Sequence, residues 1–171
     1  MSERRLPMIY LVRHGETAWT LTAQHTGRTD LPLNEHGERQ ARELEPSLAA
    51  LRIDRIFSSP LQRARRTAEL AMPHSLVEAD DDLMEWDYGA YEGRSTVDIE
   101  VERPGWRLLR DGSPGGGNAR LGNVREKDDA QAVGQLIFFQ TFDFGHAFDT
   151  RNRHSLRLGS RLLRTHGELA G

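Results

Sequence analysis

The stretch MIYLVRHGET, residues 8–17, decides the fold of this chain. Its first five residues are apolar and the run then stops at a charge cluster, which is typical of a short strand buried on both faces, as in a parallel sheet. Arg13 and His14 would then lie at the carboxyl end of the strand, where open α/β sheets bind their ligands. We expect Gly15 to let the chain turn sharply and to bring the backbone close to whatever His14 faces. A cation beside an imidazole over such a turn suits an oxyanion such as phosphate.

Length and composition narrow the class of protein. The 171 residues are enough for one domain with a substantial core, so we take residues 1–171 as a single domain. The net charge of -3 gives no electrostatic reason to expect nucleic acid or a membrane surface as a partner. The sequence has no cysteine, which excludes a disulfide framework and thiolate chemistry. Neither a membrane-spanning stretch nor the apolar core of a signal peptide is present, so we expect a soluble cytoplasmic protein.

A polar loop follows the first stretch. Residues 24–33 (QHTGRTDLPL) contain a glycine and a proline, which indicate an ordered loop. Thr26 has a hydroxyl and Gly27 has a backbone N–H that a ligand could use. A plain turn explains the same residues equally well, so both interpretations stay open at this point.

An amphipathic helix and a second strand are predicted between residues 34 and 58. Asn34 can cap the helix, and apolar residues then recur at spacings of three and four. Pro46 must kink or split this helix, because proline lacks the backbone N–H and its ring clashes with the preceding turn. Ile56 and Phe57 indicate a short buried strand that ends at two serines.

A second helix follows that strand and brings another cation to the same edge of the sheet. Ser59 is expected to cap this helix, with Pro60 in its first position. Arg63 lies in the first turn, where the helix N-terminus already favours an anion. One face of the helix carries small residues suited to close packing on a sheet: Ala64, Ala68 and Ala71.

Acidic residues occur in two groups after Val77, which marks a third strand. Residues 80–82 (DDD) are consecutive and lack an alternating ligand pattern, so we interpret them as a solvated loop and not as a metal site. Residues 83–93 (LMEWDYGAYEG) combine carboxylates with aromatic rings and glycines. Burial among aromatic rings disfavours a charged carboxylate, which makes Glu85 or Asp87 a candidate proton donor near neutral pH.

In this order, the motifs resemble the histidine phosphatase superfamily, the phosphoglycerate-mutase-like proteins. The resemblance covers residues 8–116 and implies an α/β fold: a three-layer α/β/α sandwich with a mainly parallel sheet. It rests on five segments, which are residues 11–17 (LVRHGET), 26–33 (TGRTDLPL), 58–64 (SSPLQRA), 85–93 (EWDYG and EG) and 114–116 (PGG).

The resemblance also implies a mechanism. His14 would be the nucleophile, which attacks a phosphoryl group and carries it as phosphohistidine. Arg13 and Arg63 would hold the phosphate oxygens, and Glu85 would protonate the leaving oxygen and later help to activate water. No metal and no organic cofactor is expected. The positions that contact substrate in relatives correspond to Thr20, Thr26 and Gly27, beside the two arginines.

The function implied is a phosphatase that hydrolyses small phosphomonoesters. Phosphoglycerate-mutase-type phosphoryl transfer is the alternative, although Thr20 stands where the mutases usually carry asparagine. A relative that binds phosphate esters but has impaired catalysis is the third interpretation. The sequence specifies neither the ester nor the oligomeric state.

Residues 117–171 depart from the family pattern. The family leads us to expect a second catalytic histidine, followed by glycine, directly after a buried strand. Residues 136–139 (LIFF) predict a strand, but Gln140 and Thr141 follow it, and the nearest histidine, His146, comes after a glycine. Such an abrupt change indicates a shifted reading frame or genuine divergence. We therefore expect a loosely packed tail and low activity, unless the loop of His146 returns to the site.

Overall fold

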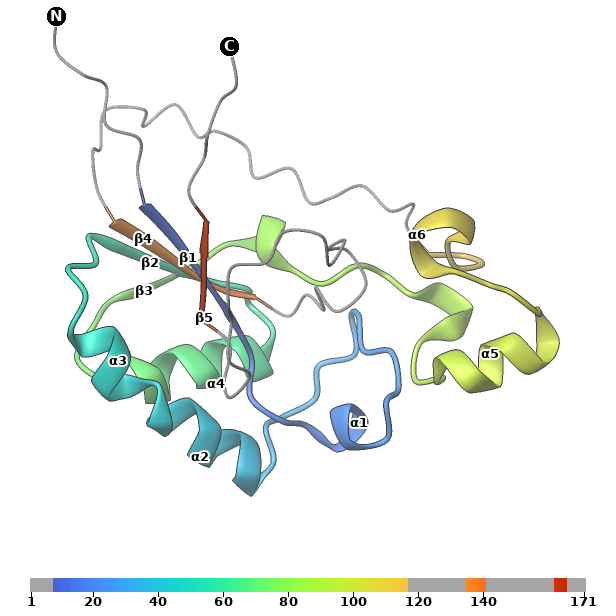
Figure 1. Cartoon of the computed structure of the whole chain (residues 1–171), viewed down its shortest axis with the longest axis horizontal. Coiled ribbons are helices and arrows are strands. Elements are labelled where there is room, and N and C mark those ends of the chain that lie inside the picture. Colours follow the sequence, from blue (N-terminus) through green and yellow to red (C-terminus); the bar gives the residue numbers. More distant parts are fainter. Residues whose placement is uncertain (1–7, 117–134, 141–161, 166–171) are drawn as a thin grey trace, which may run out of the picture.

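The computed structural model describes residues 8–116, 135–140 and 162–165. They form a five-stranded sheet in the order β3-β2-β4-β1-β5 (Figure 1). The strands are β1 (Met8–Arg13), β2 (Arg55–Ser58), β3 (Val77–Ala79), β4 (Gln135–Gln140) and β5 (Leu162–Thr165). The first four run parallel and β5 pairs antiparallel with β1, which confirms the predicted mainly parallel sheet.

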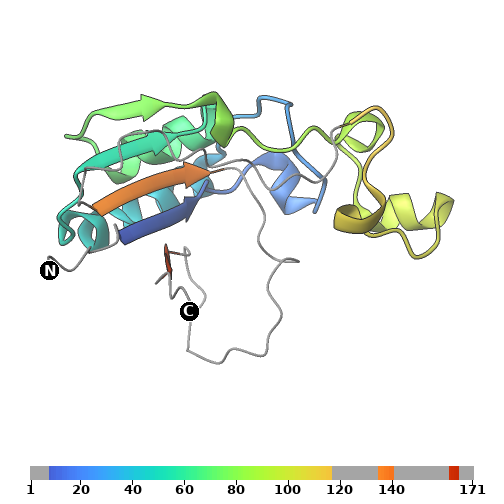
Figure 2. The ribbon, with the colours of Figure 1, turned by 90° about the horizontal axis from the view of Figure 1, so that it is seen from above.

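The described helices form one layer and a separate group. α2, α3 and α4 cover one face of the sheet, whereas α1, α5 and α6 lie beyond the carboxyl ends of the strands (Figure 2). The second helical layer of the predicted sandwich is not among the described residues. The helices are α1 (Ala18–Leu21), α2 (Glu35–Glu43), α3 (Glu45–Ala49), α4 (Gln62–Ala71), α5 (Thr96–Glu102) and α6 (Leu108–Asp111), with 3-10 turns η1 (Asp81–Leu83) and η2 (Gly89–Tyr91).

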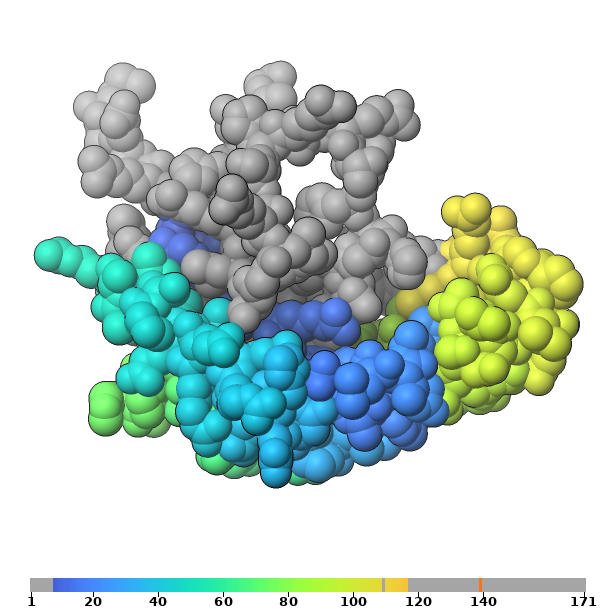
Figure 3. Space-filling view, turned by 60° about the horizontal axis from the view of Figure 1, so that its bottom comes forward, coloured from blue at the N-terminus to red at the C-terminus, as the bar shows by residue number. Residues whose placement is uncertain are grey.

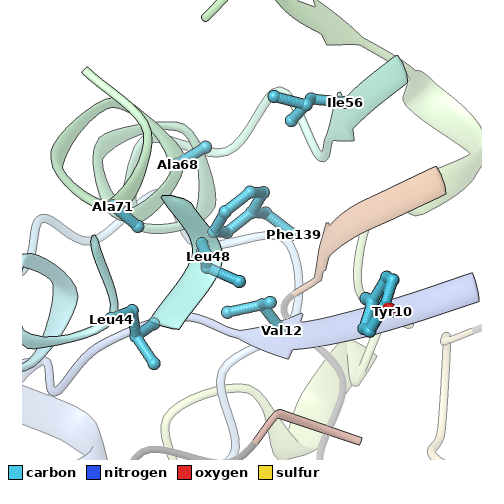
Figure 4. Packing of buried hydrophobic residues seen from close by; sticks show 8 residues of the cluster. All are labelled: Tyr10, Val12, Leu44, Leu48, Ile56, Ala68, Ala71 and Phe139. Carbon is cyan, nitrogen blue, oxygen red and sulfur yellow. The ribbon is translucent and has the colours of Figure 1, made fainter. Parts of the chain in front are cut away.

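The core lies between β1, β2 and β4 on one side and α2, α3 and α4 on the other (Figure 4). Tyr10 and Val12 of β1 point into it, whereas Ile9 and Leu11 on the opposite face are half-buried. Within the described residues, the expected burial of β1 is therefore complete on one face only. The remaining core members are Leu44, Leu48, Ile56, Ala68, Ala71 and Phe139, which include two of the three predicted small residues of α4.

Local signals correctly predict where α2 begins and ends. The side chain of Asn34 accepts a hydrogen bond from the N–H of Gly37 at 2.8 Å, so Asn34 is the cap. Leu44 separates α2 from α3, and Pro46 lies in the first turn of α3. The predicted split at Pro46 is confirmed, since proline is tolerated in a first turn but not in a helix interior.

α4 starts later than the sequence predicts. Its cap position is Leu61, so the prediction of Ser59 as the cap and Pro60 as the first helical residue is wrong. The carboxylate of Asp30, from the distant polar loop, accepts the N–H of Gln62 at 2.7 Å instead. The partner for this helix end therefore comes from tertiary structure and not from the residues just before the helix.

Candidate active site

The carboxyl edge of the sheet gathers the predicted catalytic residues. Arg13 is the exposed last residue of β1, and His14 follows it with 8% of its surface exposed. Arg63 lies in the first turn of α4 and is fully buried. Both Glu85 and Arg13 act electrostatically on Arg63, which places these three charges in one neighbourhood. The sequence therefore identified side chains that the fold brings to one region.

The ring of His14 is held by the backbone. Its Nδ1 lies 2.6 Å from the carbonyl oxygen of Gly15. Because a carbonyl oxygen can only accept, Nδ1 carries the hydrogen in the neutral imidazole and Nε2 carries the lone pair. An imidazole nitrogen with a lone pair is the form that attacks an electrophile. The backbone thus selects the tautomer in which Nε2 carries the lone pair.

Gly15 is needed for a different reason from the predicted one. Residues 14–16 form neither a turn nor a bend, and Gly15 has no positive φ, so the expected sharp turn is wrong. A Cβ on Gly15 would instead lie 2.3 Å from the carbonyl oxygen of Gly37 in the first turn of α2. A Cβ on Gly37 would in turn lie 2.2 Å from the carbonyl oxygen of Glu16. The loop after β1 and the start of α2 therefore touch backbone to backbone.

Arg63 is a buried cation bound to neutral groups. Its Nη1 donates to the carbonyl oxygen of Thr29 at 2.8 Å, and its Nη2 donates to that of Gly27 at 2.8 Å and more weakly to that of Thr26 at 3.4 Å. Its Nε has no hydrogen-bond partner among the described residues. Burial lowers the pKa of Arg63, and the negative charge of Glu85 opposes this shift. The hydrogen bonds of this guanidinium to Thr29 and Gly27 go to neutral carbonyls, so they leave its positive charge able to attract an anion.

Glu92 holds the loop to which Arg63 binds. Its Oε1 accepts the N–H of Gly27 at 2.8 Å and that of Thr29 at 3.0 Å. The interpretation that Gly27 offers its N–H to a ligand is therefore wrong, and any other contact of Gly27 with substrate stays a prediction. A Cβ on Gly27 would lie 2.1 Å from the carbonyl oxygen of Trp86, so close packing requires glycine. The sequence showed Glu92 only as part of a motif, because its partners are distant along the chain.

The two predicted threonine contacts stay predictions. The hydroxyl of Thr20 donates to the carbonyl oxygen of Thr17 at 2.9 Å and accepts the N–H of the same residue at 2.8 Å. This reciprocal cap stabilises the start of α1, so Thr20 must release Thr17 before its hydroxyl can donate to a phosphate. The hydroxyl of Thr26 lies 3.3 Å from the carbonyl oxygen of Gln24.

Burial distinguishes the two candidate proton donors. Glu85 is 3% exposed, and its Oε1 accepts the N–H of Trp86 at 3.0 Å. Asp87 is exposed and accepts the N–H of Gly89 at 2.8 Å. Of the two carboxyl groups, only that of Glu85 is therefore buried, and its role as the proton donor stays a prediction.

An aromatic cluster joins the polar loop to the segment that carries Glu85. The ring of His25 stacks on Tyr88 with 4.9 Å between centroids, and the edge of Trp106 approaches both His25 and Tyr91. The surface view shows α5 and α6 (yellow) against the loop after β1 (blue) (Figure 3). A Cβ on Gly116 would lie 2.3 Å from the carbonyl oxygen of Asp87, so the PGG motif packs backbone to backbone on this segment.

The acidic run at residues 80–82 forms a turn. Asp80 accepts the N–H of Asp82 at 3.1 Å, and the run enters η1. Among residues 8–116, 135–140 and 162–165, no group of three or more histidine, cysteine, aspartate or glutamate side chains is suited to a metal ion. No helix in the same ranges is long and apolar enough to span a membrane.

β4 confirms the strand predicted at residues 136–139. It lies between β1 and β2, with Arg13 opposite Gln140 and Ser58 opposite Phe139. Phe139 is fully buried in the core, so the expected loose packing of the tail is wrong for this strand.

The other predictions about the tail lie outside the described residues. They concern the order of the remaining tail and the ability of His146 to replace a second catalytic histidine. The described part of the tail comprises β4 and β5, and it shows which residue ends β4. Gln140 is that residue, and Thr141 follows it in the sequence.

Comparison with known proteins supplies the family. The sequence profile of the histidine phosphatase superfamily (branch 1) matches residues 9–127. The chain belongs to this superfamily. The match extends beyond residue 116, so the similarity to this superfamily reaches further along the chain than the motifs indicate.

Three relatives illustrate the range of proteins that it resembles. Sedoheptulose 1,7-bisphosphatase of Saccharomyces cerevisiae is 36% identical over 177 residues, which cover 82% of this chain and 64% of the relative. An acid phosphatase of Mycobacterium tuberculosis is 38% identical over 152 residues, which cover 84% and 74%. A Klebsiella pneumoniae protein named "probable phosphoglycerate mutase" is 43% identical over 112 residues, which cover 63% and 52%. The alignments thus span between 52% and 74% of the length of these curated relatives.

Solved structures agree with the fold. The product of an open reading frame of Mycobacterium tuberculosis matches with a TM-score of 0.68 and 32% identity, covering 80% of this chain and 74% of that one. A protein of Thermus thermophilus matches with a TM-score of 0.58 and 33% identity, covering 78% and 77%. The histidine phosphatase fold is therefore shared with proteins that are one third identical in sequence.

Proposed function

We propose that this chain is a phosphatase that hydrolyses small phosphomonoesters through a phosphohistidine on His14. The observation that carries the proposal is the hydrogen bond from Nδ1 of His14 to the carbonyl oxygen of Gly15, which makes Nε2 the basic nitrogen. Arg63, a buried guanidinium bound to backbone carbonyls, supplies the charge for the phosphate. The names of the yeast and mycobacterial relatives, a bisphosphatase and an acid phosphatase, support this substrate class.

The first step transfers the phosphoryl group to the protein. Nε2 of His14 forms a bond to phosphorus, while the bond from phosphorus to the ester oxygen breaks. Glu85, in its protonated form, gives its proton to the leaving oxygen. Arg13 and Arg63 hold the remaining phosphate oxygens and stabilise the charge that they share in the transition state.

The second step restores the protein. A water molecule attacks phosphorus as the bond to Nε2 of His14 breaks, and the carboxylate of Glu85 takes a proton from that water. Inorganic phosphate then leaves. We expect no metal or organic cofactor in either step, because the two arginines supply positive charge at the phosphate.

Two alternatives have observations in their favour. The Klebsiella relative favours phosphoglycerate-mutase-type transfer, in which a second hydroxyl takes the place of water. Thr20 in place of the mutase asparagine argues against that alternative. The end of β4 favours a relative that binds phosphate esters with impaired catalysis, since glutamine and threonine follow its apolar run where the family carries histidine.

One set of assays separates these functions. We expect the full chain to release p-nitrophenol from p-nitrophenyl phosphate and, when quenched with a labelled ester, to carry an acid-labile phosphate on His14. Interconversion of 3- and 2-phosphoglycerate would show a mutase. Ester binding without turnover would show an impaired relative.

Arg63→Lys retains the charge but loses the planar fork, and we expect kcat/KM to fall by about tenfold to a hundredfold.

A cytoplasmic location is part of the proposal. A sequence without cysteine and with nearly balanced charge suits a reducing compartment and small-molecule substrates. Fractionation of cells that express the chain, followed by detection with an antibody, tests this part independently of the chemistry.

A further inference from the structure

Two helices hold the peptide groups on either side of Gly15. The N–H of Gly15 donates to Oγ1 of Thr67 at 3.0 Å. The N–H of Glu16 donates to Oε1 of Gln40 at 2.9 Å. Thr67 belongs to α4 and Gln40 to α2, and these helices cover the same face of the sheet. The carbonyl oxygen of Gly15, which accepts the hydrogen of His14 Nδ1, belongs to the peptide that Gln40 holds.

The hydroxyl of Thr67 links two parts of the site. It is fully buried and donates to the carbonyl oxygen of Arg63 at 2.7 Å. A helical threonine often bonds the carbonyl four residues earlier. Here that bond also directs a lone pair to the N–H of Gly15, which lies 52 residues away in the sequence. The helical turn that carries Arg63 is thereby tied to the loop that carries His14.

The same loop has little room to move. Gly15 and Gly37 are in backbone contact, as the positions of their hypothetical Cβ atoms show. Asn34 accounts for two further bonds, from its N–H to the carbonyl oxygen of Glu16 at 3.0 Å and from its side chain to the Glu16 carboxylate at 2.8 Å. A rotation of the Gly15 peptide would break several of these contacts at once.

We propose that Thr67 and Gln40 are positioning residues for phosphoryl transfer. They hold Gly15 so that its carbonyl keeps the hydrogen on Nδ1 of His14 and the lone pair on Nε2. The inference rests on the proposed phosphatase function. If the Gly15 peptide could rotate, Nδ1 of His14 would lose its fixed acceptor and both tautomers would be populated. The orientation of the ring, and with it the direction of Nε2, would no longer be fixed.

Matched substitutions test this role by turnover. Thr67→Val keeps the shape and removes the hydroxyl, whereas Thr67→Ser keeps the hydroxyl. Gln40→Met removes the acceptor, whereas Gln40→Glu keeps one. We expect kcat to fall by about tenfold in Thr67→Val and Gln40→Met, with KM within about twofold, and to recover in the two conservative variants. The control is Thr22→Val, which removes an exposed hydroxyl bonded to the carbonyl oxygen of Ala18 at 3.4 Å.

Nitrogen-15 NMR of the His14 ring tests the same role without turnover. His14→Ala assigns its signals among those of the seven histidines. We expect the Nδ1–H tautomer in the wild type and in Thr67→Ser, and a mixture of tautomers in Thr67→Val. A wild type without turnover would overturn the proposed function alone. The tautomer of His14 would still show whether Thr67 and Gln40 hold the Gly15 peptide.

Two results would overturn the inference. One is a Thr67→Val variant that keeps both the Nδ1–H signature and the wild-type kcat. The other is a Thr67→Ser variant that loses as much kcat as Thr67→Val, which would show that the methyl group and its packing matter instead. If Thr67→Val does not fold, the Gln40 variants decide. The inference fails if Gln40→Met keeps both the Nδ1–H signature and the wild-type kcat, or if Gln40→Glu loses as much kcat as Gln40→Met.

Discussion

β1 and β4 are parallel neighbours that end at the same level, since Arg13 pairs with Gln140. Both are apolar runs that place a side chain in the same core, where Val12 is 1% exposed and Phe139 is fully buried. They differ at their carboxyl ends, where β1 ends in Arg13 followed by HG, and β4 ends in Gln140 followed by Thr141. An apolar run therefore suffices to place a strand in the middle of the sheet, but the chemistry depends on the residues that follow it.

Removal of the imidazole after β1 has the largest expected effect. His14→Ala should lower kcat by about 10⁴-fold or more, because the nucleophile itself is lost. The fold should persist, because His14 belongs to neither of the two apolar clusters among the described residues. Turnover of p-nitrophenyl phosphate and circular dichroism measure the two effects. Substantial turnover in a folded His14→Ala protein would contradict the phosphohistidine mechanism.

Truncation of side chains on the two strands tests their shared role in the core. Phe139→Ala should lower the free energy of unfolding by about 3–5 kcal/mol, and Val12→Ala by roughly 1.5–3 kcal/mol. Leu76→Ala is the control, since Leu76 is 85% exposed and its truncation should change stability by less than about 0.5 kcal/mol. Urea denaturation measures all three. A Phe139→Ala variant as stable as Leu76→Ala would show that β4 does not complete the core.

The missing histidine after β4 should lower the rate. Loss of one donor to the transferring phosphoryl group costs about a hundredfold to a thousandfold in kcat, and we expect this deficit relative to the mycobacterial acid phosphatase. Thr141→His places an imidazole directly after β4, as His14 directly follows β1, and should recover part of the deficit. Steady-state assays of the two proteins and of the variant measure these differences.

Two observations would count against this interpretation of the tail. A full rate that disappears in His146→Ala would show that the chain has diverged without losing function. The nucleotide sequence around the codons for residues 115–119 decides between divergence and a shifted frame. An alternative frame that encodes His-Gly directly after an apolar run would establish the shift.

The smallest expected effect lies far from either strand end. Hydrogen bonds to Asp111 from the Arg110 guanidinium and the Arg107 N–H lower the pKa of its carboxyl to about 2. Because the pKa is depressed in the folded state, the stabilisation is complete above pH ~4 and is lost as the pH falls towards 2. Asp111→Asn should therefore be slightly less stable than the wild type at pH 7, with a difference that shrinks below pH ~4 and vanishes below pH ~2. Melting temperature against pH measures this, and Asp81→Asn is the exposed control.

Elements specified by neighbouring residues were predictable. Asn34 caps α2 because the N–H that it accepts is three residues away, and Pro46 splits the helix through its own ring. The cap of α4 was not predictable, because its partner, Asp30, is 32 residues from Gln62. The role of Glu92 was missed for the same reason.

The sequence by itself determined which chemical groups stand at the edge of the sheet. His14 and Arg63 follow apolar runs that must be buried, so their order along the chain places them where strands end. Only the tertiary structure decided how these groups are held. The tautomer of His14 depends on the backbone carbonyl beside its ring, and the burial of Glu85, in contrast to the exposed Asp87, depends on the packing of the segment that carries both. The bond that fixes the His14 tautomer is local, but the peptides on either side of Gly15 are held by Thr67 and Gln40. Those two residues are far from Gly15 in the sequence, and no local pattern specifies these contacts.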